Sequence, residues 1–238
     1  MMANASESDR SSSPDTRVAV LSSNVGGHVQ VLLEHSVVGQ WIALVVAEQP
    51  DAYALRHAQW HGVTAVALHA GKSYLDLYDT ALVRLLEEHS IDYVVVAGFL
   101  RIVGTETVRA YEDRIVKVHH SLLPEFPGPD PVADALELGV KETGVTVHLI
   151  NRELEAGPIV SQQALEVRDG ENWHSLTQRL HELEMQLLPV AVRTLVEARR
   201  SCPRMTSDQV PKSCCTGRQG QERNGETDHD YGSVGLHS

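Results

Sequence analysis

The sequence predicts an α/β protein with a doubly wound, mostly parallel sheet and an antiparallel addition near its C-terminal end. Through about residue 140, short aliphatic and β-branched runs alternate with amphipathic helical patterns, which is typical of a parallel sheet covered by helices. Beyond that point two strand-like runs, 144–150 and 159–167, follow each other without a helical pattern between them. Because a short connection suits antiparallel neighbours, we expect these two strands to extend the sheet in the antiparallel sense.

The individual elements follow from periodicity and from residues that start or end helices. Gly26 and Gly27 form a turn between the first strand and the first helix, Asp51 suits a helix start, and Gly139 ends a helix. The run 91–97 is the most strand-like and should lie centrally in the sheet. The final helix carries a core stripe of leucines at positions 176, 180, 183 and 187. The expected strands are 18–21, 41–47, 63–68, 91–97, 115–118, 144–150 and 159–167, and the expected helices are one from about residue 29 and others at 51–60, 74–89, 105–111, 131–138 and 173–198.

We predict one domain, residues 17–200, with a disordered segment at each end. Residues 1–16 are Ser-rich and polar, and residues 201–238 hold hardly any large aliphatic side chains. All three cysteines (Cys202, Cys214 and Cys215) fall in this C-terminal segment, in a spacing that fits no zinc pattern. We therefore predict neither a disulfide framework nor a metal site.

Charge and hydropathy narrow the class of protein. The formal net charge of −12 argues against non-specific binding to nucleic acid, which needs a basic surface. No apolar run approaches the ~20 residues of a membrane span, and the N-terminal segment lacks the apolar centre of a signal peptide. We expect a cytoplasmic protein with no nucleic-acid or membrane partner.

Residues 114–128, RIVKVHHSLLPEFPG, combine an apolar strand with polar chemistry at its end. Ile115, Val116 and Val118 place apolar side chains on both faces, as in a strand that is covered on both sides. In open α/β sheets, ligands bind at the carboxyl ends of strands, so His119 is a candidate functional group. A structural histidine is the alternative at this position.

Four motifs occur along the chain: AGFLRIV (97–103), VHHSLLPEFPG (118–128), GVTVHLI (144–150) and LEAGPIV (154–160). On these motifs the chain resembles the folate-dependent formyltransferases, and most closely those that act on phosphoribosylglycinamide. The resemblance covers about residues 17–198. It implies a Rossmann-like formyltransferase fold, 10-formyltetrahydrofolate as the cosubstrate, and one-carbon chemistry similar to that of purine biosynthesis.

The resemblance also implies a catalytic set of His119, Lys117 and Glu155. His119 matches the family's catalytic histidine, whereas Lys117 replaces an Asn and Glu155 replaces an Asp. Formyl transfer builds negative charge on the formyl oxygen while a proton leaves the attacking amine, so a donor, a histidine and a carboxylate meet its needs. Lys117 can still donate to the oxyanion, while Glu155 extends the carboxylate by one methylene and shifts the proton relay.

A folate slot follows from the same resemblance. Its members are Leu100, Arg101, Val103, Val108 and Ile150, with backbone groups near Arg152 at the pterin edge. Ordinary core packing is the alternative for the apolar members, but it explains an arginine within an apolar lip less well.

The side of the acceptor amine departs further from the family. The family's Gly-Ser-Asn phosphate loop becomes Gly26-Gly27-His28, a basic residue becomes Leu75, and a Gln becomes His181, while the acid that contacts ribose is kept as Glu184. A ligand-free turn is the alternative at the two glycines. The predicted acceptor-binding residues are Gly26, Gly27, His28, Gly128, His181 and Glu184.

We therefore predict a divergent formyltransferase that transfers a formyl group from 10-formyltetrahydrofolate to a small amine, with phosphoribosylglycinamide disfavoured as the acceptor, acting as a monomer or homodimer. One alternative is a folate-binding pseudoenzyme in which the changes at Lys117 and Glu155 have ended turnover. The other is a formyltetrahydrofolate hydrolase. The segments HHS (119–121) and GPDP (128–131) are similar to segments of formyltetrahydrofolate deformylases.

Overall fold

The computed structural model describes residues 16–23, 26–69, 75–99, 103–151 and 157–201. Its strands form one sheet in the order β3-β2-β1-β4-β5-β6-β7. The strands are β1 (Val18–Ser22), β2 (Ile42–Ala47), β3 (Thr64–Ala67), β4 (Tyr93–Val96), β5 (Ile115–His119), β6 (Glu142–Ile150) and β7 (Ile159–Glu166). The strands β1 to β5 pair in parallel, whereas β6 is antiparallel to both β5 and β7. The predicted fold class, including its antiparallel addition, is confirmed.

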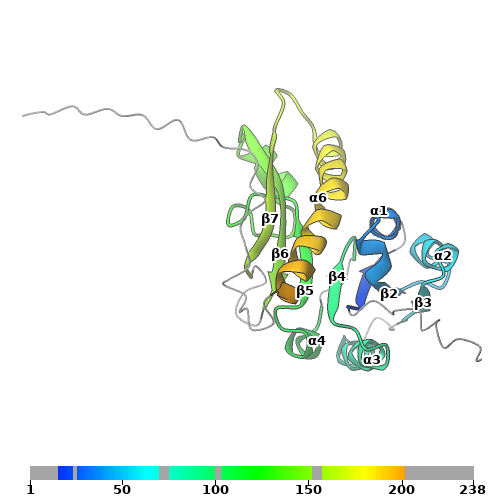
Figure 1. Ribbon diagram of the computed structural model, residues 1–238. Helices are drawn as coiled ribbons and strands as arrows, with labels where there is room; N and C mark the ends of the chain where they lie inside the picture. Colours follow the sequence, from blue (N-terminus) through cyan, green and yellow to red (C-terminus); the bar gives the residue numbers. More distant parts are fainter. Residues whose placement is uncertain (1–15, 24–25, 70–74, 100–102, 152–156, 202–238) are drawn as a thin grey trace, which may run out of the picture.

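Helices cover both faces of the sheet (Figure 1). They are α1 (Gly27–Glu34), α2 (Tyr53–Trp60), α3 (Leu75–Glu88), α4 (Thr105–Ala110), α5 (Pro131–Glu137) and α6 (Trp173–Ser201), with a short 3-10 turn η1 (Val38–Trp41). One buried cluster joins the sheet to α1, α2, α5 and α6, and we call it the α1/α6 core. The other joins the opposite face to α3 and α4, and we call it the α3/α4 core. The result is a three-layer α/β/α arrangement.

Local sequence explains the main elements. The leucine stripe of α6 is buried, with Leu176 and Leu180 at 0% exposure. Helix α5 starts with Pro131 in its first turn and with the Asp130 carboxylate accepting the Ala133 N–H, and Gly139 follows its end at a φ of +62°. Strand β4 is the middle strand of the sheet, as its apolar sequence predicts.

Several boundaries differ from those expected. Trp41 belongs to η1 rather than to the second strand, because its buried side chain continues the apolar pattern without continuing the extended backbone. Helix α2 begins at Tyr53, β6 begins earlier at Glu142, and α6 extends to Ser201. Disorder was predicted for residues 1–16 and 201–238, but Thr16 is buried and Ser201 ends α6, so the prediction is wrong at these two positions. For residues 1–15 and 202–238, which lie outside the described residues, it stays a prediction.

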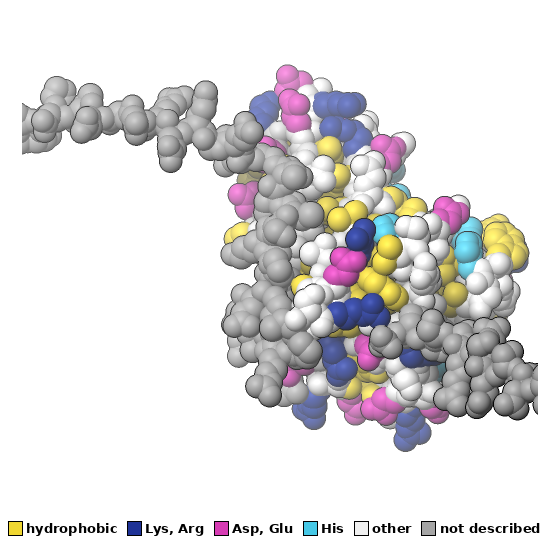
Figure 2. All heavy atoms as spheres, viewed as in Figure 1, with side chains coloured by type: hydrophobic (Ala, Val, Ile, Leu, Met, Phe, Trp, Pro, Cys, Tyr) yellow, Lys and Arg dark blue, Asp and Glu magenta, His cyan; other side chains and the backbone are white. Residues whose placement is uncertain are grey.

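Charged side chains of both signs are spread over the visible surface (Figure 2). On the face shown in Figure 2, acidic and basic side chains of the described residues are interspersed rather than gathered into one basic area. None of the helices in the described part combines the length and the apolar character needed to cross a membrane.

Candidate active site

Strand β5 places Lys117 and His119 on one face of the sheet. Lys117 lies opposite His148 of β6, and His119 lies opposite Thr146. Because alternate residues of a strand point to the same side and directly paired residues share a face, these four side chains lie together. Ile115, two residues before Lys117, belongs to the α3/α4 core. The basic group formed by Lys117, His119 and His148 therefore lies at the end of β5 on the α3/α4 side.

The ring of His119 is oriented by the loop that follows β5. Its Nε2 lies 2.7 Å from the carbonyl oxygen of Phe126. Since a carbonyl only accepts, this contact requires the proton on Nε2, and in the neutral ring Nδ1 then carries the lone pair. The sequence-predicted catalytic histidine thus has one defined tautomer, with Nδ1 as the basic nitrogen.

The SLLP loop is fixed to the neighbouring strands by one buried threonine. Thr146 donates to the Ser121 carbonyl at 2.6 Å and accepts the Leu123 N–H at 3.2 Å. Gln162 of β7 also donates to Thr146 Oγ1 at 2.8 Å. These bonds hold the loop whose Phe126 carbonyl orients His119, so the imidazole position depends on β6 and β7 as well as on β5.

His148 is a buried base held neutral by its surroundings. Only 2% of the residue is exposed, and burial lowers its pKa from 6.5 to about 4, while the charges of Lys117 and His119 act in the same direction and the hydrogen bond to the Leu149 carbonyl opposes them. Because the Lys117 charge contributes to the lowered pKa of His148, the ammonium group acts on this face of the sheet. The basic group therefore combines a cation with a neutral imidazole.

The described members of the predicted folate slot belong to or pack against the α3/α4 core. Ile150 ends β6 and is buried in the α3/α4 core, against which Val103 and Val108 pack. Asp79 of α3 fixes this region by accepting the N–H groups of Glu106 and Thr107 at 2.7 and 3.2 Å, which caps α4. Ile150 thus lies two residues from His148 on β6, and Val103 and Val108 pack against the same core, while their contact with folate stays a prediction.

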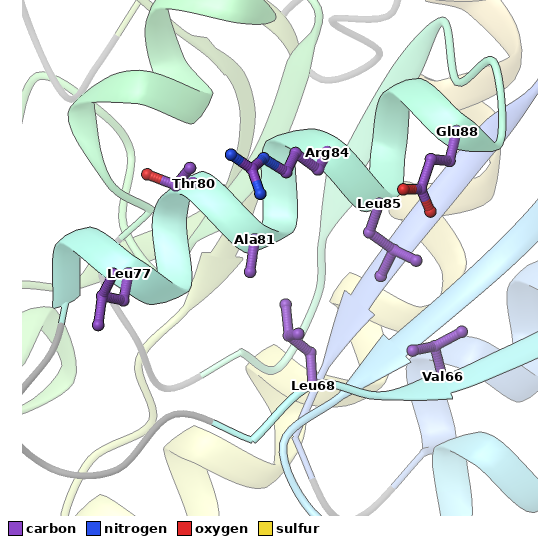
Figure 3. A pocket seen from close by; sticks show the side chains of 8 residues that line it. All are labelled: Val66, Leu68, Leu77, Thr80, Ala81, Arg84, Leu85 and Glu88. Atoms are coloured by element: carbon purple, nitrogen blue, oxygen red, sulfur yellow. The ribbon is translucent and has the colours of Figure 1, made fainter.

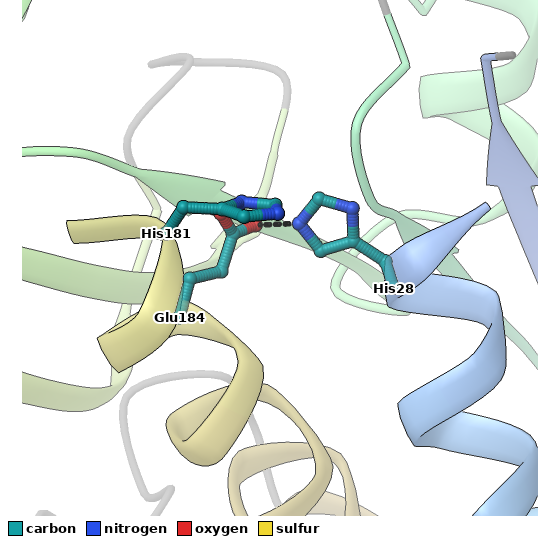
Figure 4. A group of neighbouring side chains, drawn as sticks. All are labelled: His28, His181 and Glu184. Atoms are coloured by element: carbon teal, nitrogen blue, oxygen red, sulfur yellow. Dashed lines mark ion pairs between the residues drawn. The ribbon is translucent and has the colours of Figure 1, made fainter. Parts of the chain in front are cut away.

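A second group of ionisable residues lies on the other face, at the α1/α6 core (Figure 4). Glu184 of α6 is only 4% exposed. Its Oε1 lies 2.8 Å from His28 Nε2, its Oε2 accepts a hydrogen bond of 2.8 Å from His120 Nε2, and His181 Nδ1 lies 3.4 Å from Oε2. His120 follows His119 directly, so the two adjacent histidines serve opposite faces of the sheet. We call His28, His120, His181 and Glu184 the imidazole–carboxylate cluster.

Electrostatics keep the carboxylate of this cluster ionised. Burial alone would raise the pKa of Glu184, but the contacts with His120, His181 and His28 together place it well below its usual value. The contact with Glu184 in turn raises the pKa of His181. The cluster is thus a buried anion surrounded by nitrogen donors.

The predicted glycine positions have different surroundings. Gly26 adopts a φ of +74°, and a Cβ there would lie 2.7 Å from the backbone nitrogen of Ala54, so the turn also serves the packing of α1 against α2. A Cβ on Gly27 would meet the Met185 side chain at 2.8 Å. Gly128 lies in the loop before α5, where a Cβ would lie 3.3 Å from Asp134. The described contacts of Gly128 thus connect it with α5 rather than with the imidazole–carboxylate cluster.

Some predicted residues lie outside the described part of the chain. These are Leu100, Arg101, Arg152 and Glu155, and the side chain of Leu75 is likewise not described. Their roles stay predictions.

The residues that sequence reasoning missed are His148 and His120. His148 stands in the motif GVTVHLI, and its alternation with Thr146 was the available signal for its face. His120 adjoins His119, and the same alternation indicates that it points the other way.

A separate cavity of about 400 Å³ opens between β3 and α3 (Figure 3). Val66, Leu68 and Leu85 supply its apolar wall, and Arg84 and Glu88 lie at its border. Strand β3 is at the edge of the sheet, with β2, β1 and β4 between it and β5. This cavity is therefore apart from both groups of histidines.

The model of a protein family described as formyl transferase matches residues 16–192 of this chain. The phosphoribosylglycinamide formyltransferase of Bacillus subtilis (strain 168) is 30% identical over 185 residues, which are 76% of this chain and 94% of that protein. A match of 33% identity to the trifunctional purine biosynthetic protein adenosine-3 of Drosophila melanogaster covers 76% of this chain but only 14% of that protein.

Solved structures of formyltransferases and of a deformylase share the fold of this chain. Glycinamide ribonucleotide transformylase 1 from Symbiobacterium toebii superposes with a TM-score of 0.71 at 34% identity, covering 77% of this chain and 89% of that one. A formyltetrahydrofolate deformylase from Pseudomonas syringae pv. tomato superposes with a TM-score of 0.70 at 27% identity, covering 77% of this chain and 62% of that one.

The chain belongs to the folate-dependent formyltransferase family, and the resemblance on its four motifs is confirmed. Members of this family are enzymes that use a folate-derived cosubstrate. Among the relatives above are phosphoribosylglycinamide formyltransferases, whose fold this chain shares.

Proposed function

We propose that this protein transfers a formyl group from 10-formyltetrahydrofolate to a small amine other than phosphoribosylglycinamide. The observation that carries the proposal is the basic group of Lys117, His119 and His148 at the end of β5, with the apolar Ile150 two residues from His148 on β6. This arrangement combines a charge-stabilising cation, an oriented imidazole and an apolar wall within one face of the sheet.

The reaction needs each of these parts. The acceptor nitrogen attacks the formyl carbon, the carbonyl π electrons move to oxygen, and the bond from carbon to the folate nitrogen then breaks. The Lys117 ammonium stabilises the oxyanion by a charge-assisted interaction. His119 takes the proton of the attacking amine at Nδ1, because Nε2–H is held by Phe126. The same proton then passes to the leaving folate nitrogen, so the products are a formamide and tetrahydrofolate.

Glu155 completes this scheme by resemblance to the family. A carboxylate there orients His119 or a water molecule during the proton transfer. The described apolar residues Val103, Val108 and Ile150 fit the aromatic pterin, since they present an apolar surface within the α3/α4 core.

The acceptor side supports an amine of different structure. His28 stands where the family has an Asn of its phosphate loop, and a Cβ on Gly98 would lie only 2.9 Å from its Nδ1. The ring is therefore packed between Gly98 and His181, whose ring centroid is 4.8 Å away. A bulky ring in place of a short amide leaves less room for a phosphate at this turn.

Purified full-length protein tests the proposal with 10-formyltetrahydrofolate and a panel of small amines that includes phosphoribosylglycinamide. Release of tetrahydrofolate should depend on an amine, and His119→Ala should lower the rate by at least about 100-fold, as for a general base. Lys117→Ala should lower kcat by about 100-fold with little change in KM for folate, as for loss of an oxyanion donor. Lys141→Ala, which removes a lysine that pairs with Asp169 on the exposed surface, is the matched control and should act like the wild type. Equal turnover in His119→Ala would refute the proposal.

Hydrolysis of the formyl group is the second candidate. It is favoured by the structural match to a formyltetrahydrofolate deformylase. In that case a water molecule replaces the amine, and formate appears at the same rate with and without the amine panel. Enzymatic measurement of formate in the same reactions separates the two activities.

A further inference from the structure

The imidazole–carboxylate cluster has the composition of a metal site. His28 comes from α1, whereas His181 and Glu184 lie three residues apart on one face of α6 (Figure 4). One donor atom from each of these residues lies within 4.8 Å of the other two. Two imidazole nitrogens and one carboxylate oxygen are a ligand set that Zn²⁺ sites use.

The ring of His28 is buried and faces the carboxylate. The residue is 8% exposed, and its Nε2 forms an ion pair with Glu184 Oε1 at 2.8 Å. A cation bound between these two atoms would take both as ligands in place of their direct contact.

The separations suit shared coordination. Two donor atoms that each bind a zinc ion at about 2.1 Å lie about 3 Å apart at a right angle and about 3.4 Å apart at the tetrahedral angle. The distance from His28 Nε2 to Oε1 is 2.8 Å, whereas His181 Nδ1 lies 3.4 Å from the other carboxylate oxygen, Oε2, and all three donor atoms lie within 4.8 Å of one another. Because the His181 side chain is 43% exposed, its ring can turn toward His28 to close the set.

The surrounding residues hold the ligands in place. His120 donates to Glu184 Oε2 at 2.8 Å, which fixes the carboxylate and leaves Oε1 facing His28. Ligating carboxylates in metal sites are commonly hydrogen-bonded in this way. Gly98 backs the His28 ring, since any side chain there would overlap it.

We propose that His28, His181 and Glu184 bind a divalent transition-metal ion of the Zn²⁺ class, with His120 as a positioning residue for the carboxylate. Imidazole ligands favour Zn²⁺, Co²⁺ or Ni²⁺ over Mg²⁺ and Ca²⁺, which prefer oxygen. Three protein ligands leave a coordination position for water or for an oxygen of a small molecule. The inference does not depend on formyl transfer, because metal binding is measured directly.

The test is calorimetric titration of chelator-treated, full-length protein with Zn²⁺. The C-terminal thiols must first be removed by C202S, C214S and C215S, since cysteine thiolates bind zinc themselves. We expect one equivalent of Zn²⁺ to bind. His120→Ala should weaken this binding by about 10–100-fold, and His181→Ala and His28→Ala should weaken it further. Substitution with Co²⁺ gives visible absorption bands that should be lost in the same variants.

A matched control lies on the same helix. His174 is exposed on α6 and stacks edge-on against Trp173 rather than facing Glu184, so His174→Ala should bind zinc like the parent chain. Because His181 is partly exposed, His181→Ala keeps the fold even where changes at His28 or Glu184 do not. The proposal is overturned if the thiol-free chain binds no stoichiometric Zn²⁺, or if His181→Ala binds it as tightly as His174→Ala.

Discussion

The buried imidazole of His148 should make the protein lose stability as the pH falls below neutrality. Its pKa is about 4 in the folded protein, against 6.5 for the unperturbed side chain. Between these values the unfolded state binds a proton that the folded state does not, so the free energy of unfolding decreases with falling pH. The contribution of His148 is complete above about pH 6.5 and is lost as the pH approaches 4.

The magnitude follows from the shift in pKa. A change from 6.5 to about 4 corresponds to a total of about 3 kcal/mol. Of this, about 2 kcal/mol is lost between pH 7.5 and pH 5, where the unfolded chain is already almost fully protonated at this site. Burial is the largest cause, so most of the effect should remain when the Lys117 charge is removed.

Urea unfolding followed by circular dichroism measures this effect at several pH values. The readout is the difference in pH dependence between the wild type and His148→Gln, because other groups titrate in both proteins. We expect the variant to lose about 2 kcal/mol less than the wild type between pH 7.5 and pH 5, and Lys117→Met to stay close to the wild type. Parallel pH profiles for wild type and His148→Gln would refute the reasoning.

Three further predictions concern the scaffold, each measured by urea unfolding at neutral pH. Asp79→Ala should cost about 2–3 kcal/mol because it leaves buried N–H groups of α4 without an acceptor, whereas Thr80→Ala, which removes an exposed hydrogen bond, should cost clearly less. Gly26→Ala should cost about 1 kcal/mol or more, since φ is +74° and the new Cβ would approach the α2 backbone at 2.7 Å; an unchanged midpoint would contradict the required glycine. Leu180→Ala should cost about 2–5 kcal/mol as a cavity in the core, and Leu138→Ala, at 71% exposure, should stay near zero.

Local patterns explain why most of the fold was predictable. The apolar run 91–97 became the central strand β4, and the leucine spacing of α6 became a buried face, because both signals lie within one element. The turn η1 was missed because hydropathy reports burial and not backbone conformation, and Trp41 is buried in either case. Element ends are set by contacts such as these rather than by periodicity.

Some residues of the candidate site could likewise be predicted from the sequence, and others could not. His119 could be found from its strand-end position and from the family motif around it. The resemblance also named His28, His181 and Glu184 for the acceptor side. It did not name His120, which follows β5 and meets Glu184 of α6 only in the folded chain. The effect of Lys117 on His148 depends on the register between β5 and β6, which cannot be read from either strand's pattern alone.

The most direct test of the central proposal follows an isotopically labelled formyl group. The full-length protein is incubated with labelled 10-formyltetrahydrofolate and the amine panel, and the products are identified by mass spectrometry. We predict that one amine gains the label in an amount equal to the tetrahydrofolate formed, and that His119→Ala forms neither product. If the label stays on the folate with every amine, or leaves only as formate, the chain is not a formyltransferase of the proposed kind.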